Sequence, residues 1–155
     1  MNRQEFKIFP IGKVRRDESG IRLEIGGEFK DGLLELEKFS HVIVLWWAHG
    51  HDNEEDRKIM ETALPYAENT RAGVFACRAE YRPNPIAVTV CPISDIDQNK
   101  GIINIKGIDA IDYSPILDLK PYIPVCDRVD DFTIPKWFTG WPTCLPEKGL
   151  QLEYD

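Results

Sequence analysis

The sequence predicts an all-β protein: a single small β-barrel with short helical turns and an irregular C-terminal tail rich in proline and tryptophan. Many short apolar segments are separated by turn-forming residues, which is typical of barrels and sandwiches. The chain has no glycine-rich GxGxxG loop, so a doubly wound nucleotide-binding fold is not expected. Its 155 residues are enough for one hydrophobic core. We expect residues 1–155 to form one domain, with the core in residues 6–125 and the tail in residues 126–155.

The first half of the chain contains the clearest strand patterns. Residues 6–14 and 21–25 alternate in polarity and are rich in β-branched side chains, so they predict a hairpin around the polar turn RRDESG. Residues 31–40 predict a short helical turn with Asp31 as its N-cap. The continuous apolar run HVIVLWWA, residues 41–48, predicts a buried strand.

The second half predicts further short strands and a tail. The acidic residues 51–69 are expected to form a surface helix or loop, because Pro65 limits any helix. Four more strands are expected at residues 73–78, 85–93, 101–108 and 116–119. From Pro121 onward we expect a tail that wraps over the barrel. Its aromatic residues include Trp137, Phe138 and Trp141. These three could seal the core, or they could stack on a substrate or form a dimer contact.

Composition excludes several classes of protein. The formal net charge of -7 argues against generic, charge-driven nucleic-acid binding, although Arg71, Arg78 and Arg82 could form a local patch. No apolar run reaches the roughly 18 residues that span a bilayer, and the N-terminus lacks a signal-peptide pattern, so we expect a cytoplasmic protein without a membrane segment. The four cysteines are widely spaced without a CxxC pair, which predicts reduced thiols and no metal.

Two arginine-bearing segments are candidates for binding. In RPNPI, residues 82–86, two prolines fix the backbone and would present Arg82 and Asn84 in one orientation; the alternative is a stiff strand entry without a ligand. Arg78 follows the apolar segment GVFAC. It could hold a carboxylate or phosphate, or it could be a solvated surface residue.

Histidines and aspartates at strand ends are the remaining candidates. His49 and His51 flank Gly50 and could act as a base, as ligands or as polar residues at a strand end, whereas His41 is expected to be structural. The segment GIDAIDYSPILDLKPY carries Asp109, Asp112, Asp118, Lys120 and Tyr122. Its aspartates could accept hydrogen bonds from ribose hydroxyls or an amino group, or could be solvated turn carboxylates.

Four ordered blocks resemble the TrmO family, also called TsaA-like, of tRNA N6-threonylcarbamoyladenosine methyltransferases. They are IGKV, LEKFSHVIVL, GVFACRAEYRPNPIAV and GIDAIDYSPILDLKPY, and they span residues 6–125. The resemblance implies a single small β-barrel that binds S-adenosylmethionine near a homodimer interface. It also implies methylation of N6-threonylcarbamoyladenosine next to the tRNA anticodon. Two alternatives remain open: a small-molecule methyl acceptor, or a barrel that binds the cofactor without catalysis.

The resemblance also assigns roles to individual residues. It places the cofactor contacts on His49, Gly50, Arg78, Val88, Asp109, Ala110, Ile111 and Asp112. It places substrate-side residues at Arg82, Asn84 and Lys120, and the candidates for accepting a proton or orienting the substrate are Asp118, Tyr122 and His49.

The chain also departs from the family pattern. Ala79 and Glu80 replace Ser-Pro, Ala87 replaces Gly, and the DGTP turn becomes residues 112–115, DYSP. The basic segment that follows the first strand in the family has no clear counterpart at residues 15–20. A negative charge at Glu80 suits a sulfonium better than a phosphate.

Overall fold

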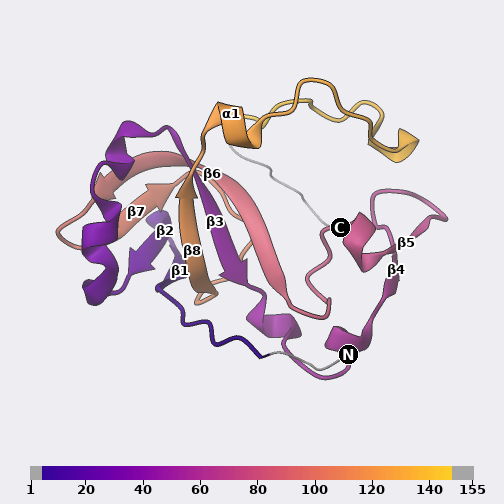
Figure 1. Cartoon of the computed structure of the whole chain (residues 1–155), viewed down its shortest axis with the longest axis horizontal. Coiled ribbons are helices and arrows are strands. Elements are labelled where there is room, and N and C mark those ends of the chain that lie inside the picture. The colour runs from indigo at the N-terminus through magenta and orange to yellow at the C-terminus, as the bar shows by residue number, and fades with distance from the viewer. Residues whose placement is uncertain (1–4, 148–155) are drawn as a thin grey trace.

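Six antiparallel strands close into a barrel (Figure 1). A computed structural model describes residues 5–147 of the chain. Around the barrel the strands follow the order β1 (Gly12–Asp17), β2 (Gly20–Ile25), β7 (Ile102–Ile105), β6 (Ile86–Asp97), β3 (His41–Trp47) and β8 (Pro115–Pro121). The predicted all-β barrel is therefore confirmed.

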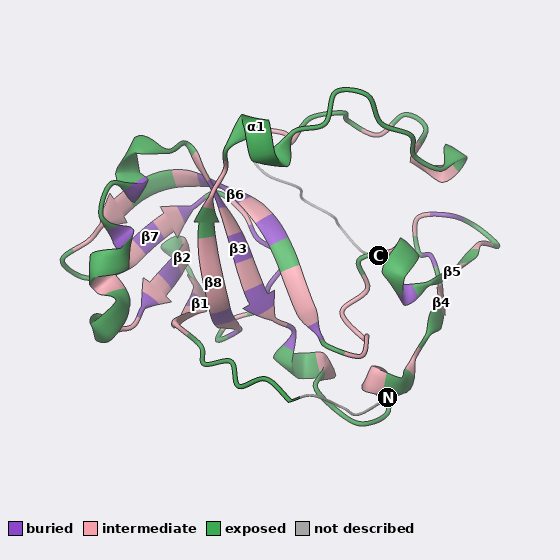
Figure 2. Ribbon diagram, viewed as in Figure 1, coloured by how far each residue is buried: buried purple, intermediate pink, exposed green. Residues whose placement is uncertain are grey.

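Buried and partly buried residues alternate along barrel strands such as β3 and β7 (Figure 2). In β3, Val42, Val44 and Trp46 are buried, and the Trp46 indole Nε1 donates to Thr89 Oγ1 at 3.1 Å. The other residues of β3 are only partly buried. The apolar run at residues 41–48 thus forms the predicted core strand, with one face buried in the barrel and the other partly buried.

The first strand is displaced from its predicted position. Residues 6–11 lie outside any strand, and β1 continues through the two arginines that were expected to form a turn. Gly12 begins the pairing with β2, and a Cβ atom at this position would lie 2.3 Å from Glu24 O. Only a glycine fits there, which fixes where the two strands can meet. The turn itself is short, because Asp17 pairs with Gly20.

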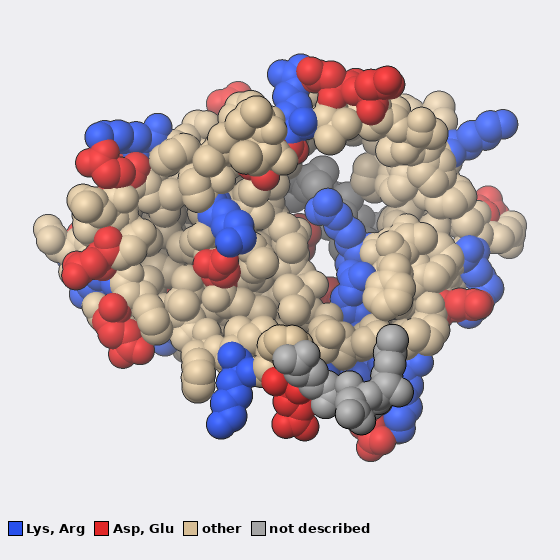
Figure 3. Space-filling view, viewed as in Figure 1, with Lys and Arg blue, Asp and Glu red and all other residues tan. Residues whose placement is uncertain are grey.

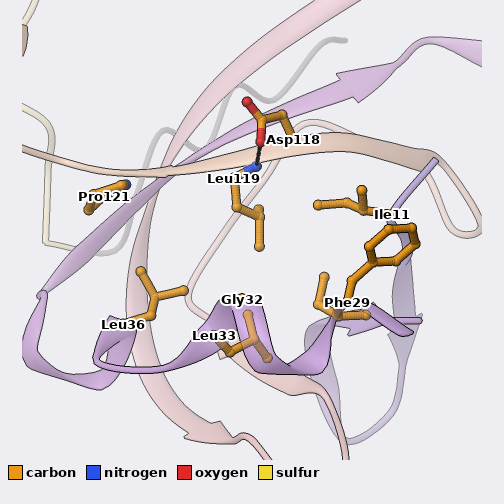
Figure 4. Close-up of a pocket in the computed structure, with 9 residues that line it drawn as sticks. Ile11, Phe29, Gly32, Leu33, Leu36, Asp118, Leu119 and Pro121 are labelled. Carbon is orange, nitrogen blue, oxygen red and sulfur yellow. Dashed lines mark hydrogen bonds between the residues drawn. The ribbon is translucent and has the colours of Figure 1, made fainter. Parts of the chain in front are cut away.

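Two 3-10 helices, η1 (Gly27–Leu33) and η2 (Leu36–Lys38), occupy the region of the predicted helical turn. Asp31 lies inside η1 and is not its N-cap, which is Gly26. Leu33 and Leu36 are buried and close the barrel end at which β3 begins. An apolar pocket of about 250 Å³ lies between these helices and β8 (Figure 4); its lining includes Ile11, Phe29, Leu33, Leu36 and Leu119.

The part of the chain between β3 and β6 projects from the barrel. After η3 (His49–His51) and η4 (Asp56–Lys58), β4 (Glu61–Ala63) and β5 (Arg71–Gly73) form a two-stranded hairpin. The next residues form η5 (Val74–Ala76), so the strand predicted at residues 73–78 is wrong. Val74 is buried but Phe75 is 80% exposed, a pattern that suits a turn between two surfaces.

The tail packs on this hairpin and not over the barrel core. It contains α1 (Pro124–Asp127) and η6 (Lys136–Phe138). The ring of Tyr66, from the hairpin, lies 5.5 Å from the rings of both Phe138 and Trp141. The expectation that Trp137, Phe138 and Trp141 seal the barrel core is therefore wrong, and residues 148–155 of the predicted tail lie outside the described residues. We call the hairpin with residues 132–146 the projecting unit.

Within residues 5–147, no helix is both long and apolar enough to cross a bilayer.

Candidate functional site

Three segments meet at one end of the barrel because of the strand order. β3 lies between β6 and β8 and runs antiparallel to both, so the end of β3 adjoins the starts of its two neighbours. Ala48 N donates to Pro85 O at 2.8 Å, which joins the residues after β3 to the RPNP corner. A Cβ atom on Gly50 would lie 4.0 Å from Ile111 Cδ1. We call this the site end of the barrel.

Two arginines of β1 hold the loop that precedes β8. Arg16 Nε donates to Ala110 O at 2.7 Å, and its Nη2 donates to Ile108 O. The Arg16 backbone N–H and the Arg15 Nε both donate to Asp112 Oδ1, at 2.8 and 3.1 Å. These contacts fix residues 108–112, and sequence reasoning missed them. The two consecutive arginines were visible, but they were taken for part of a polar turn.

The two aspartates of this loop have different environments. Loss of water contact raises the pKa of Asp109, and the nearby Arg16 and Arg78 moderate the rise. The pKa of Asp112 is lowered, mainly by the hydrogen bond from the Arg16 backbone N–H. Asp112 is therefore an anchor of the loop. Asp109 lies in the field of Arg78, so the structure brings together these two residues of the predicted cofactor set.

Glu80 lies at the same end, in a chain of polar contacts. Its Oε2 is 3.3 Å from His51 Nε2, and His51 Nδ1 is 2.9 Å from Asp56 Oδ2. Burial raises the pKa of Glu80, His51 and His49 lower it, and Asp109 raises it further. Glu80 and Asp109 are thus two carboxyl groups at the same end, each partly removed from water and close enough for Asp109 to raise the pKa of Glu80. From the sequence, Glu80 is a departure from the family pattern whose charge suits a sulfonium, but its contact with His51 is not predictable.

The RPNP corner connects the barrel to the projecting unit. Arg82 Nη2 donates to Val74 O at 2.9 Å, so its guanidinium is held by η5. Asn84 is exposed, and its backbone carbonyl accepts from Ile86 N at 2.7 Å. Val88 lies two residues after Ile86, the first residue of β6; it pairs with Leu45 and is 42% exposed.

The remaining predicted residues lie along β8, away from the site end. Asp118 pairs with Leu45 and Lys120 with Ile43, and their side chains form an ion pair of 2.7 Å. Tyr122 N donates to His41 O, at the start of β3. Six residues of a strand span about 20 Å, so Tyr122 is remote from the end of β3 at Trp47. The structure brings His49, Gly50, Arg78 and residues 109–112 together, but not Lys120 and Tyr122.

The site end opens toward a gap between the barrel and the projecting unit. Figure 3 shows this opening through the molecule, with basic side chains along its side. The loops around it offer exposed backbone groups, two partly dehydrated carboxyl groups and the Arg78 guanidinium. Such a set can bind a ligand that carries a positive charge, hydroxyl groups and a carboxylate. Among residues 5–147, no group of three histidine, cysteine or acidic side chains is arranged to bind a metal.

The fold and the candidate site define a class: small closed antiparallel β-barrels with a cluster of polar loops at one barrel end and without a glycine-rich phosphate loop. Within this class, the chain belongs to the tRNA-methyltransferase O family, because the model of that family's N-terminal domain matches residues 3–128.

Individual relatives agree with this assignment. A probable S-adenosyl-L-methionine-binding protein of Methanocaldococcus jannaschii is 43% identical over 117 residues, which cover 74% of this chain and 90% of the relative. The mouse tRNA (adenine(37)-N6)-methyltransferase is 33% identical over 116 residues, 74% of this chain but 26% of that protein. The crystal structure of TrmO from Pseudomonas aeruginosa matches with a TM-score of 0.67 and 27% identity. That match covers 87% of this chain and 62% of the TrmO chain.

Proposed function

We propose that the protein transfers a methyl group from S-adenosylmethionine to a nitrogen of tRNA, namely N6 of threonylcarbamoyladenosine beside the anticodon. The observation that carries this proposal is the convergence of His49–Gly50, Arg78 and residues 109–112 at one barrel end. The names of the archaeal and mouse relatives support the cofactor and the adenine acceptor, respectively. A tRNA substrate would place the protein in the cytoplasm.

The residues at the site end fit this cofactor chemically. The sulfonium charge suits Glu80 and Asp109, whose carboxyl groups are partly dehydrated. Arg78 would bind the carboxylate of the amino-acid part, and the loop of residues 109–112 would bind ribose and adenine through its polar groups. The bound cofactor supplies an already activated methyl group. The chain's own residues would therefore act mainly by aligning donor and acceptor.

The acceptor nitrogen must lose one proton during the transfer, and the candidates differ in position. Of the three predicted residues, His49 lies at the site end of its own chain, whereas Asp118 and Tyr122 lie along β8. Arg82 and Asn84 at the RPNP corner, together with Lys120, remain the proposed substrate-side residues. We propose His49 as the proton acceptor within one chain; it lies close enough to Glu80 to lower the pKa of that carboxyl group.

We also propose that the protein acts as a homodimer, with a second copy covering the tail. Several apolar residues between 125 and 134 are strongly exposed: Val125 is 89%, Val129 67%, Phe132 49% and Ile134 52% exposed. Several strongly exposed apolar side chains within one short segment are a feature of interaction surfaces. Sedimentation equilibrium should give the mass of two chains, and Val125→Asp with Val129→Asp should reduce it to one. A single-chain mass for the unmodified protein would refute the dimer.

Two measurements test the proposed activity. Calorimetry with S-adenosylmethionine should show binding, and Arg78→Ala should weaken it more than Arg71→Ala, a matched change at an exposed arginine of β5. Labelled cofactor should then transfer its methyl group to tRNA from normal cells but not to tRNA that lacks threonylcarbamoyladenosine. Labelling of a metabolite extract alone would favour a small-molecule acceptor, and binding without any transfer would favour a non-enzymatic module. Absence of binding at millimolar cofactor would reject the proposal.

A further inference from the structure

Tyr113 adopts a backbone conformation that is unfavourable for its residue type. It is the third residue of a turn in which Ser114 N donates to Ile111 O at 3.2 Å, and its φ is +64°. Glycine or asparagine normally occupies this position, because a side chain crowds the backbone in the left-handed region. The tyrosine nevertheless stands there with 56% of its surface exposed, so burial does not compensate for the strain. Strain of this kind clusters at functional sites, and Tyr113 directly follows the loop of residues 109–112 at the site end.

The ring of Tyr113 is held in place by basic side chains of β1. The Arg15 guanidinium lies 4.3 Å from the ring centroid, and Lys13 Nζ lies 5.5 Å from it. Tyr113 N donates to Val14 O at 2.8 Å, so the ring lies across the two residues that flank Val14. Asp112 fixes the Arg15 guanidinium from the other side, and Glu24 lies 3.6 Å from Lys13 Nζ. The ring is therefore ordered as well as exposed.

Tyr113 also stands at the edge of the proposed methyl-transfer site. It directly follows residues 109–112, and Ile111 of the same turn is 57% exposed and packs toward Gly50. An ordered aromatic ring with cations beside it is a typical platform for an unpaired nucleobase, because the base stacks on the ring and the cations attract the adjoining phosphates.

We infer that Tyr113, with Arg15 and Lys13, forms a stacking platform for an unpaired base of an RNA substrate at the edge of the site. This inference rests on the proposed function, since it names the surface that would receive a nucleotide of the anticodon loop. The ring supplies the stacking surface and its hydroxyl is dispensable. Binding therefore depends on an aromatic group at this position and not on the base sequence.

Fluorescence anisotropy with a labelled tRNA anticodon stem-loop tests the platform without the cofactor. Tyr113→Gly and Tyr113→Asn suit the left-handed backbone and remove the ring. Each should raise the Kd about fivefold or more, since stacking on one aromatic ring contributes about 1–3 kcal/mol per base. Tyr113→Phe should stay within about twofold of the unmodified protein. The melting temperature of the glycine variant should not fall, which separates loss of binding from loss of the fold.

Glu35→Gly is the matched control. Glu35 also has a positive φ, of +70°, but it lies beside η2 at the opposite end of the barrel. Its replacement should leave RNA binding unchanged. Unchanged binding by Tyr113→Gly and Tyr113→Asn, or an equal loss in Tyr113→Phe, would overturn the platform. Failure to bind S-adenosylmethionine would instead reject the proposed function, and because the RNA assay contains no cofactor, the two failures are distinguishable.

Discussion

Replacing Arg16 by methionine tests whether the loop before β8 depends on one side chain. Arg16 donates from Nε to Ala110 O and from Nη2 to Ile108 O, and both acceptor residues are almost completely buried. Methionine keeps much of the apolar stem but leaves both carbonyl groups without their donors. A hydrogen bond from a charged group contributes about 1.5–3 kcal/mol. Arg16 itself is only partly buried, so each of its two bonds should contribute near the lower value of this range. We therefore expect the free energy of unfolding to fall by about 3 kcal/mol.

Urea denaturation measures this loss directly, and the melting temperature should fall by roughly 6–12 °C. Calorimetry on the folded variant should also show weaker binding of S-adenosylmethionine, because residues 109–112 lose their fixed orientation. Arg22→Met is the control: Arg22 forms ion pairs with Asp17 and Glu24 on the surface of the neighbouring strand, and its loss should change stability much less. If the two variants are equally stable and bind the cofactor equally well, Arg16 does not hold the loop.

Three other changes have predictable outcomes. Glu80→Gln should weaken the binding of S-adenosylmethionine several-fold in calorimetry but leave the binding of S-adenosylhomocysteine unaffected, because only S-adenosylmethionine carries the sulfonium charge. Lowering the pH through the raised pKa of Glu80 should have the same effect. Leu23→Ala, at a fully buried position, should cost about 2–5 kcal/mol in urea denaturation. Acid should destabilise the fold, because hydrogen bonds lower the pKa of Asp17 to about 2 and also lower the pKa of Asp112. The stability that these carboxylates contribute is present above the ordinary carboxyl pKa and should be lost as the pH falls toward 2. Circular dichroism can follow this loss.

The sequence predicted the barrel strands where the local pattern agreed with the final environment. The segments around β3, β6, β7 and β8 are apolar and β-branched, and all four form strands near the expected positions. Residues 73–78 are also apolar, yet they form a turn after β5. Residues 73–78 contact the hairpin and the RPNP corner instead of a neighbouring strand of the barrel. The periodicity of a short apolar run does not distinguish these two environments.

The site was predictable as a set of residues but not as a geometry. Residue types at strand ends made His49, Arg78 and Asp109 candidates, and the family resemblance added Gly50 and the rest of the 109–112 loop; the antiparallel order of β6, β3 and β8 brings these residues to one end. The arginine that holds the loop lies 94 residues from one of its acceptors, Ala110. No local pattern contains such a contact. The same reason explains the tail, whose aromatic residues pack on a hairpin that was itself not predicted.

The catalytic roles predicted for Asp118 and Tyr122 depend on the proposed dimer. Tyr122 lies beside the start of β3, about 20 Å along the strand from the end that carries His49. A side chain does not cover that distance within one chain, so Tyr122 can serve a transfer at the site end only by reaching the site of a second copy. Asp118 is nearer, but Lys120 already holds its carboxylate. The proposed dimer and the predicted role of Tyr122 are therefore coupled. If the protein is monomeric and still methylates tRNA, Tyr122 has no part in the mechanism. His49 is then the only one of the three predicted residues at the site end of its own chain.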